Sequence, residues 1–550
     1  MNKKNLLKRF QFKKKGKPSG LERFILFLVL VGGVLIVFFI GRLLYSNLAP
    51  HSNLSDYLPG DKTVAYVEWK DLKLPESLQS DYPPQALGTF IGGLFEFDLQ
   101  AAMEEFGTGQ IAYALLETTE GKNEPLILVE TKNKSIALSY FKSLLLDGEE
   151  LESTKDLNPI YNFPQGQNFE FKFLGRYVAI SPEKELLELL GVPEAESLTE
   201  ENSYQSSLNH LPRNPWLIAY IDVQKVTFTK QPQLRQVIEP LKFTANHLSF
   251  AVRKSNEGFQ FNSYLNLKDG LLNLEEVNEG EKFKHELTQY IPKENLVFYV
   301  GGSNLEVEWQ NTLETLSNLN PAYALILEGM LRAQSEDIFG GNIDLRNDLY
   351  PLFENEYAFV MGKNEDVNEI GLILRHDDEE FAKVKMEKMA KGFEMIAASF
   401  APKVNTVTLP DGTISRELVP DESKVESGTS DVAGNEVVCT EIRGDSLGFC
   451  YAVTEKMVLM ANNKTFIENA LIQKEDSMLA DDIDFKANTK KLSQINDEMT
   501  FIRFEKLNEL LPSNIYLDAL TPFIQKMESS AWTKHYFKNA ATLEGVLTIK

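Results

Sequence analysis

Apolar and polar positions divide the start of the chain into a basic leader and one long apolar run. Residues 24–40 are an unbroken run of 17 apolar residues or glycines. Extended to residue 45, the run gives about 33 Å of helix at ~1.5 Å per residue, which is enough to cross a hydrocarbon core of about 30 Å. The pattern predicts a single transmembrane helix over residues 24–45.

The leader, residues 1–23, holds nine basic residues and one acidic residue. Because basic residues mark the cytoplasmic side of a span, the N-terminus is predicted in the cytoplasm and residues 46–550 outside it. A cleaved secretory signal is the alternative. Its apolar region is usually about 7–15 residues, so we favour an uncleaved signal-anchor in the lipid bilayer. The basic residues nearest the predicted helix are Lys13, Lys14, Lys15, Lys17 and Arg23.

Beyond the leader, short alternating segments mix with segments of helical spacing. Residues 63–69 alternate as in a half-buried strand, and residues 110–116 and 125–130 predict a hairpin over a polar turn. Apolar residues between 381 and 400 recur at helical spacing and predict one face of a long helix. Strands joined by tight turns favour antiparallel sheets with helices on a face.

The outer part of the chain also resembles itself. Residues 58–67 match residues 291–300, and residues 169–180 match residues 449–460, in the same order along the chain. This order predicts two related tandem lobes, and chance similarity between two α+β domains is the alternative. The predicted segments are lobe 1 over 54–268, an acidic connector over 269–286, and lobe 2 over 287–550 with a polar insertion at 401–436. The predicted fold class is α+β: an N-terminal transmembrane helix followed by two tandem lobes with mainly antiparallel sheets and covering helices.

Composition and charge narrow the classes of function. Two cysteines exclude a disulfide-rich scaffold and a four-thiolate zinc site. Six scattered histidines leave little room for a histidine-based metal centre, and no cofactor or metal site is predicted. Residues 46–550 carry 46 basic and 79 acidic side chains. Such a body repels a phosphate backbone, so nucleic acid is not an expected partner. The acidic balance suits a basic partner, and solubility alone is the simpler explanation.

The two cysteines lie at positions that predict a disulfide. If Gly444 and Asp445 form a two-residue hairpin turn, Cys439 and Cys450 face each other on neighbouring strands. Facing Cα atoms in such ladders are about 4.5–5.5 Å apart, within disulfide range. A location outside the cytoplasm permits oxidation. We predict a cross-strand disulfide, and two unpaired thiols in a core are the alternative.

Sequence motifs for phosphate loops, dinucleotide binding, zinc proteases, calcium loops and serine hydrolases do not occur. His376, Asp377 and Asp378 are the candidate catalytic cluster, because an imidazole beside carboxylates can act as a base or bind a cation. The alternative is a strand that ends in a helix cap. We favour the cap, since no nucleophile or third ligand accompanies the cluster.

Three short segments of the chain are mainly apolar. The first is Leu58-Pro59-x-Asp61-x-x-Val64-Ala65-Tyr66-Val67, and the others are residues 177–181 and residues 216–222. Placed after a single predicted span, they resemble a bacterial family known as domain of unknown function 3352. The resemblance covers most of residues 54–550 and implies a membrane-tethered extracytoplasmic protein, but it supplies no activity and no site residues. The second copy departs from the pattern, with Lys293-Glu294 in place of Gly60-Asp61.

A duplicated, acidic, motif-poor body favours a non-catalytic protein of the cell envelope whose lobes bind a protein or polymer partner. A carrier or sensor that holds a small or apolar ligand in a cleft between the lobes is one alternative. An envelope hydrolase centred on His376 is the other. Enzymatic activity is left open, with a non-catalytic role favoured.

Overall fold

The structure, a computed structural model, describes residues 54–550 apart from internal gaps. The long gaps are 71–98, 228–240, 269–282 and 511–523. The short gaps are 147–148, 157, 165–167, 193–195, 304, 306–308, 311–312, 314–315, 318–319, 342, 365–366, 411, 444–446, 494–495 and 538. The predicted tail and transmembrane helix, including Lys13, Lys14, Lys15, Lys17 and Arg23, lie outside the described residues.

The first unit is an antiparallel sheet with helices, built from the described part of residues 54–271 and the end of the chain, 539–550. Its strands, in spatial order, are β4 (Glu152–Ser153), β5 (Ile160–Asn162), β6 (Glu170–Leu174), β7 (Tyr177–Ser181), β3 (Asn123–Thr131), β2 (Gly107–Glu117), β1 (Thr63–Trp69), β8 (Leu217–Asp222), β9 (Ala245–Ser255), β10 (Gly258–Leu267) and β22 (Ala540–Ile549). Its helices include η2 (Leu54–Tyr57), α4 (Leu99–Glu105), α5 (Lys134–Ser143), α6 (Lys184–Leu189) and α7 (Asn202–Leu208).

The second unit comprises the described part of residues 272–538. Its sheet runs β16 (Val425–Val432), β17 (Asn435–Ile442), β18 (Gly448–Val453), β19 (Met457–Ala461), β13 (Val367–Arg375), β12 (Glu356–Asn364), β11 (Leu296–Ser303), β20 (Glu498–Arg503) and β21 (Met527–Phe537). Its helices include η4 (Glu286–Tyr290), α10 (Pro321–Phe339), η6 (Tyr350–Phe353), α11 (Glu379–Phe400), α12 (Lys464–Ile472), α13 (Ile483–Thr489) and α14 (Phe504–Leu510).

The two units share one order of strands. β1 lies between β2 and β8, and β11 likewise lies between β12 and β20. The next neighbours also correspond, because β7 pairs with β3 and β19 pairs with β13. Even an isolated bridge is matched, Pro59 to Ser197 in one unit and Pro292 to Met478 in the other.

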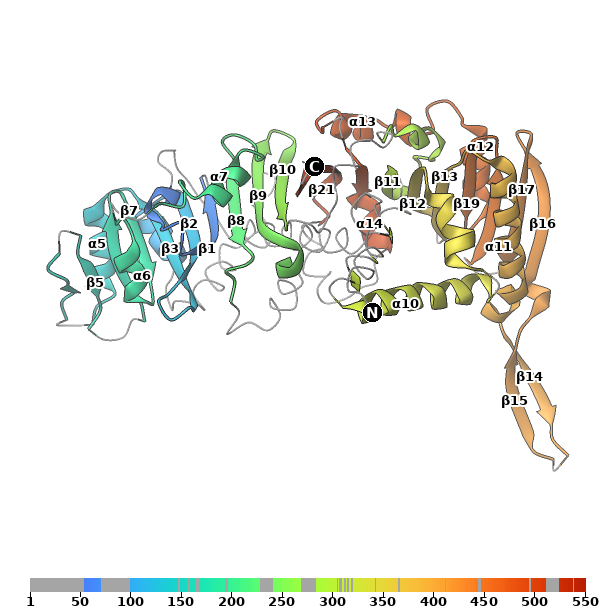
Figure 1. Ribbon diagram of the computed structural model, residues 1–550, viewed down its shortest axis with the longest axis horizontal. Coiled ribbons are helices and arrows are strands. Elements are labelled where there is room, and N and C mark those ends of the chain that lie inside the picture. The colour runs from blue at the N-terminus through green and yellow to red at the C-terminus, as the bar shows by residue number, and fades with distance from the viewer. Residues whose placement is uncertain are drawn as a thin grey trace, which may run out of the picture. The chain divides into compact units, whose positions relative to one another are not determined.

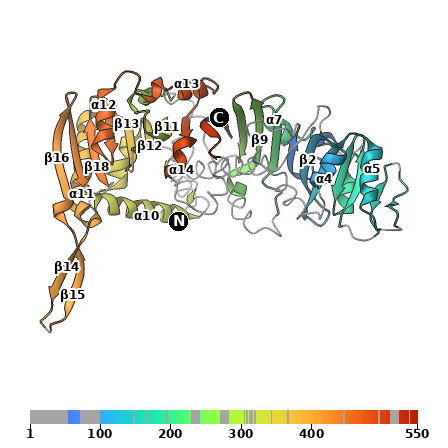
Figure 2. The same ribbon diagram turned by 180° about the vertical axis from the view of Figure 1, so that it is seen from behind.

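Helix α11 shows how the second unit builds its core. Asp378 caps the helix, and buried Ala382, Met386, Met389 and Phe393 recur at the spacing of one helical face. This face packs against β17 and β18 (Figure 1). Beyond α11 the chain leaves the sheet as a separate two-stranded ribbon, β14 (Lys403–Thr408) and β15 (Ile414–Val419). The ribbon projects from that end of the unit in both views (Figure 1, Figure 2).

The predicted fold class is wrong in its arrangement, although antiparallel sheets with helices are present. Among the residues that the structure describes, none of the helices combines the length and apolar character needed to cross a membrane. The two bodies are also not simple tandem lobes. β22, at the end of the predicted second lobe, pairs along β10 and belongs to the first unit. Chain order therefore differs from spatial order at the last strand.

Candidate functional site

The predicted catalytic cluster lies where β13 ends and α11 begins, and each of its side chains has a different neighbour. Asp378 Oδ1 accepts a hydrogen bond from the Phe381 amide at 2.9 Å, as a helix cap does. Asp377 accepts from the Asn355 side chain at 3.3 Å. His376 Nε2 lies 2.9 Å from the carbonyl oxygen of Thr454, to which it donates. The three groups do not converge on one point.

The two cysteines lie opposite each other on β17 and β18 and form a disulfide. Their Cα atoms are 4.0 Å apart. The register matches that of a two-residue turn at Gly444 and Asp445, although this turn itself falls in one of the gaps in the described chain. Phe449, the neighbour of Cys450, packs in the core around α11. Because side chains alternate along a strand, the buried disulfide lies on the other face of the sheet.

The β14–β15 ribbon has apolar side chains on one side, Val404, Ile414 and Leu418, which we call the ribbon face. Val404 stands directly opposite Leu418. Ile414 lies on the same side, beyond Thr406 and Arg416. The three apolar side chains are 60%, 63% and 73% exposed, respectively. The predicted polar insertion therefore exposes a group of large apolar side chains. The other side carries Lys403, Asn405, Ser415 and Glu417 together with Val407 and Val419.

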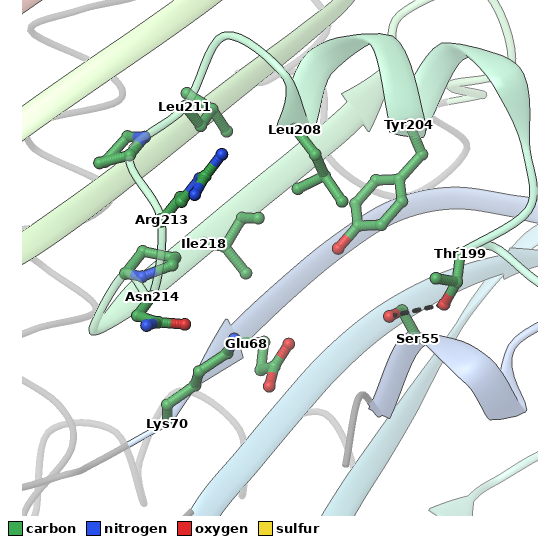
Figure 3. Close-up of a pocket in the computed structure, with 12 residues that line it drawn as sticks. Ser55, Glu68, Lys70, Thr199, Tyr204, Leu208, Leu211, Arg213, Asn214 and Ile218 are labelled. Atoms are coloured by element: carbon green, nitrogen blue, oxygen red, sulfur yellow. Dashed lines mark hydrogen bonds between the residues drawn. The ribbon is translucent and has the colours of Figure 1, made fainter. Parts of the chain in front are cut away.

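A pocket of about 190 Å³ lies in the first unit, between β1, α7 and the loop that leads into β8 (Figure 3). Its polar lining comes from Ser55, Glu68, Lys70, Thr199, Tyr204, Arg213 and Asn214. Its apolar lining comes from Leu208, Leu211, Pro212, Pro215 and Ile218. At one end, the Thr199 hydroxyl donates a hydrogen bond to the Ser55 hydroxyl at 3.1 Å (Figure 3).

Glu68 is the buried charge of this pocket and is only 2% exposed. The Tyr66 hydroxyl donates to Glu68 Oε2 at 2.7 Å, and the Gln110 amide donates to Oε1 at 2.7 Å. Burial raises the pKa of the Glu68 carboxyl above its usual value, while the positive charge of Lys70 and the two hydrogen bonds act in the opposite direction.

A chain of hydrogen bonds fixes the group that holds Glu68. Gln110 Oε1 accepts from the Tyr177 hydroxyl at 3.2 Å, so its Nε2 must point at Glu68. The Arg176 guanidinium donates to the same Tyr177 oxygen and forms an ion pair with Glu130 at 2.9 Å. The orientation of the amide next to Glu68 is therefore set by its neighbours.

The second unit fills the corresponding position differently. At the offset that relates residues 58–67 to residues 291–300, Gly301 stands where Glu68 stands, and Tyr299 where Tyr66 stands. A Cβ atom on Gly301 would lie 2.1 Å from the Tyr299 hydroxyl oxygen. This oxygen is buried and makes no hydrogen bond within the described structure. The first unit thus buries a tyrosine that donates to a carboxyl group. In the second unit the Tyr299 hydroxyl makes no hydrogen bond within the described structure, and burial together with the charge of the buried Glu356 raises its pKa.

We expect Tyr66→Phe and Tyr299→Phe to differ in effect although the two tyrosines occupy matching positions. Tyr66→Phe removes a donor from a buried carboxyl and should lower the free energy of unfolding by about 1–3 kcal/mol. Tyr299→Phe removes no hydrogen bond and should be neutral or slightly stabilising. Urea unfolding of both variants measures this. Equal losses would show that the Tyr66 hydrogen bond does not stabilise the protein.

Sequence reasoning missed Glu68, Lys70 and Arg213. A signal for Glu68 was present, because Val64, Tyr66 and Glu68 occupy the inward phase of a strand whose alternation was recognised. An acid in that phase marks a buried charge. Arg213 lies in a loop and carries no periodic signal.

The described ranges contain no group of three or more histidine, cysteine or acidic side chains that could hold a metal ion. A family model described as "Protein of unknown function (DUF3352)" matches residues 100–543, which confirms the predicted resemblance. No curated protein matches the chain.

Two solved structures are similar to part of the chain. "Structure of crystal form III of TP0453" is 10% identical, with 40% of this chain and 82% of that chain covered and a TM-score of 0.23. "Structure of crystal form IV of TP0453" is 8% identical, with 38% and 81% covered and a TM-score of 0.22. At such TM-scores the likeness carries no argument about this chain.

Proposed function

The chain belongs to the family described as protein of unknown function DUF3352, and from that premise we propose that it is a non-catalytic binding protein outside the cytoplasm that docks a protein partner on the ribbon face. The observation that supports this proposal is the exposed ribbon face. Val404, Ile414 and Leu418 expose most of their surface on one side of a free-standing pair of strands.

Two physical arguments support docking there. A two-stranded hairpin alone is marginally stable in water, and clustered exposed apolar side chains mark interaction surfaces. A partner that covers the ribbon face would stabilise the hairpin and would also remove its apolar side chains from water. β14 and β15 pair with each other in a sheet of two strands, so a partner strand can add to an outer edge of the ribbon.

The disulfide supports the proposed location. Bonds between cysteines form and persist in oxidising compartments and are rare in the cytosol. The Cys439–Cys450 bond joins two buried strand positions, where reducing agents reach it slowly. A net charge of −24 for the whole chain further suits a partner with a basic rim around its apolar centre.

A face-specific crosslinking experiment tests the proposal. A photo-reactive residue at position 418 reports on the ribbon face, and one at position 417 reports on the opposite side of the same strand. We expect a discrete protein adduct from 418 in intact cells and a much weaker one from 417. Val404→Thr with Ile414→Thr should remove the 418 adduct, because threonine keeps strand propensity but loses apolar surface.

Val407→Thr with Asn405→Thr is the matched control, since it also changes two residues of the ribbon, but on the other side. This control should leave the 418 adduct unchanged. Adducts of equal strength from both positions, or an adduct that survives Val404→Thr with Ile414→Thr, would argue against docking on the ribbon face.

A further inference from the structure

We propose that the pocket of the first unit binds a small zwitterion, such as a free amino acid, with its ammonium group on Glu68 and its carboxylate between Lys70 and Arg213. This site is separate from the ribbon face and does not depend on the docking proposed above. Its argument rests on the unused bonding capacity of three charged groups, on the volume of the pocket, and on the contrast with the second unit.

Glu68 has room for a donor. A carboxylate offers about four acceptor positions on its two oxygens, and Tyr66 and Gln110 occupy one on each oxygen. The carboxyl lines the pocket although it is almost fully shielded from water. Burial raises the pKa of Glu68, and a bound ammonium group would favour its charged form again.

Lys70 and Arg213 bring two positive charges to the same pocket from different elements (Figure 3). Lys70 directly follows β1, and Arg213 lies in the loop before β8. Neither side chain forms an ion pair with a described residue. Burial raises the pKa of Glu68, and the positive charge of Lys70 lowers it without a direct contact. Cations without an ion pair among the described residues suit a carboxylate, which arginine can bind through two parallel hydrogen bonds.

The volume limits the ligand. Sites for drug-sized molecules measure about 300–1,000 Å³, whereas this pocket measures about 190 Å³. Leu208, Leu211 and Ile218 leave an apolar part of the wall for a short aliphatic side chain. A single free amino acid meets all three requirements of size, opposite charges and a small apolar group.

The second unit shows that the fold does not need this carboxyl. The matching strand position holds Gly301, and the Tyr299 side chain occupies the place of a Cβ there. The buried acid that acts on Tyr299 is Glu356, from a different strand. Burial of a carboxylate costs stability unless its partners compensate fully. The second unit does without an acid at this position of its strand, so the position of Glu68 is not required by the fold, and its carboxyl can serve a ligand.

Calorimetric titration of the full-length chain with free amino acids from glycine to leucine tests the proposal. Ethylamine supplies the ammonium alone, and acetate the carboxylate alone. We expect at least one amino acid to bind, and the two single-charge probes to bind at least about tenfold more weakly, because each lacks a charge-assisted contact. No binding of any amino acid at about 10 mM, tenfold above a ~1 mM Kd, would overturn the proposal.

Variants separate the roles of the charges. Glu68→Gln should weaken binding at least about tenfold, but it sets two amide groups against each other at Gln110 and can disturb folding. Arg213→Gln changes an exposed loop residue, keeps the fold, and should weaken binding of amino acids and of acetate while ethylamine is unaffected. Glu120→Gln, an exposed acid outside the pocket lining, is the control and should change nothing. Wild-type affinity in Arg213→Gln, or ethylamine binding as tightly as the amino acids, would overturn the zwitterion.

Discussion

Removal of residues 539–550 should unfold the first unit, although these residues follow the whole second unit in sequence. They form β22, which pairs along β10 from Gly258 to Asn266. Leu543, Val546 and Leu547 of β22 are buried there. Burial of three such side chains is worth about 5–9 kcal/mol, which is comparable with the roughly 5–15 kcal/mol that stabilises a domain. The fluorescence of Trp216 reports this loss, because its ring lies 5.7 Å from Phe259, the β10 residue opposite Leu547.

A point substitution where β10 pairs with β22 supplies an independent control. Gly258 has a φ of +145°, and a Cβ atom there would lie 2.0 Å from the carbonyl oxygen of Leu547. Gly258→Ala should therefore weaken the first unit without any loss of chain. A synthetic peptide of residues 539–550 should restore the Trp216 signal of the truncated chain. A truncated chain that unfolds at the wild-type urea concentration would contradict the role assigned to β22.

Loss of the Cys439–Cys450 disulfide should lower the free energy of unfolding of the second unit by about 2.5–3 kcal/mol. The bond closes a loop with a sequence separation of 11 residues and so restricts the unfolded chain, an effect of this size in the chain-entropy description. Urea unfolding of Cys439→Ala with Cys450→Ala measures the loss, since alanine fills both buried positions without a polar group. The first unit, which holds neither cysteine, should be unaffected.

Reduction of the wild-type protein is the matched control, because it breaks the same bond without a change of residue. Reduced wild type and the double alanine variant should unfold at similar urea concentrations. Thiol titration of the unreduced, denatured protein should find no free thiol. Two reactive thiols, or a reduced protein as stable as the oxidised one, would count against a stabilising bond.

Hydrophobic periodicity predicted helices and strands well where one side of a segment is buried and the other is exposed to solvent. The alternation at residues 63–69 matches β1, and the predicted hairpin at 110–130 matches β2 and β3 with slightly longer strands. The helix predicted between 381 and 400 is α11, which begins two residues earlier at Glu379. For α11 and β1 the core lies mainly on one face, so the period of the sequence carries the signal. β3 is buried on both faces from residue 125 to residue 131, so its signal is a short apolar run after a polar turn.

Local sequence patterns do not predict which distant segments of the chain pair with each other. The strand at the C-terminus could be recognised as apolar and alternating, but nothing in its composition says that it pairs with β10. The polar composition of residues 401–436 hid β14, β15 and the edge strand β16. The strand phase of Glu68 was a readable signal, but the pocket around it was not, because its wall comes from α7 and the loop at residue 213, far along the chain.

The position of β22 has a consequence for how the protein is made. Synthesis proceeds from the N-terminus at about 5–20 residues per second, and domains generally fold as they emerge. The first unit cannot complete its sheet until β22 has left the ribosome, because this strand follows the whole second unit in sequence. A prematurely terminated product leaves β10 as an open edge, which is prone to aggregate and accessible to proteases. Synthesis of the whole second unit is therefore a condition for a complete first unit.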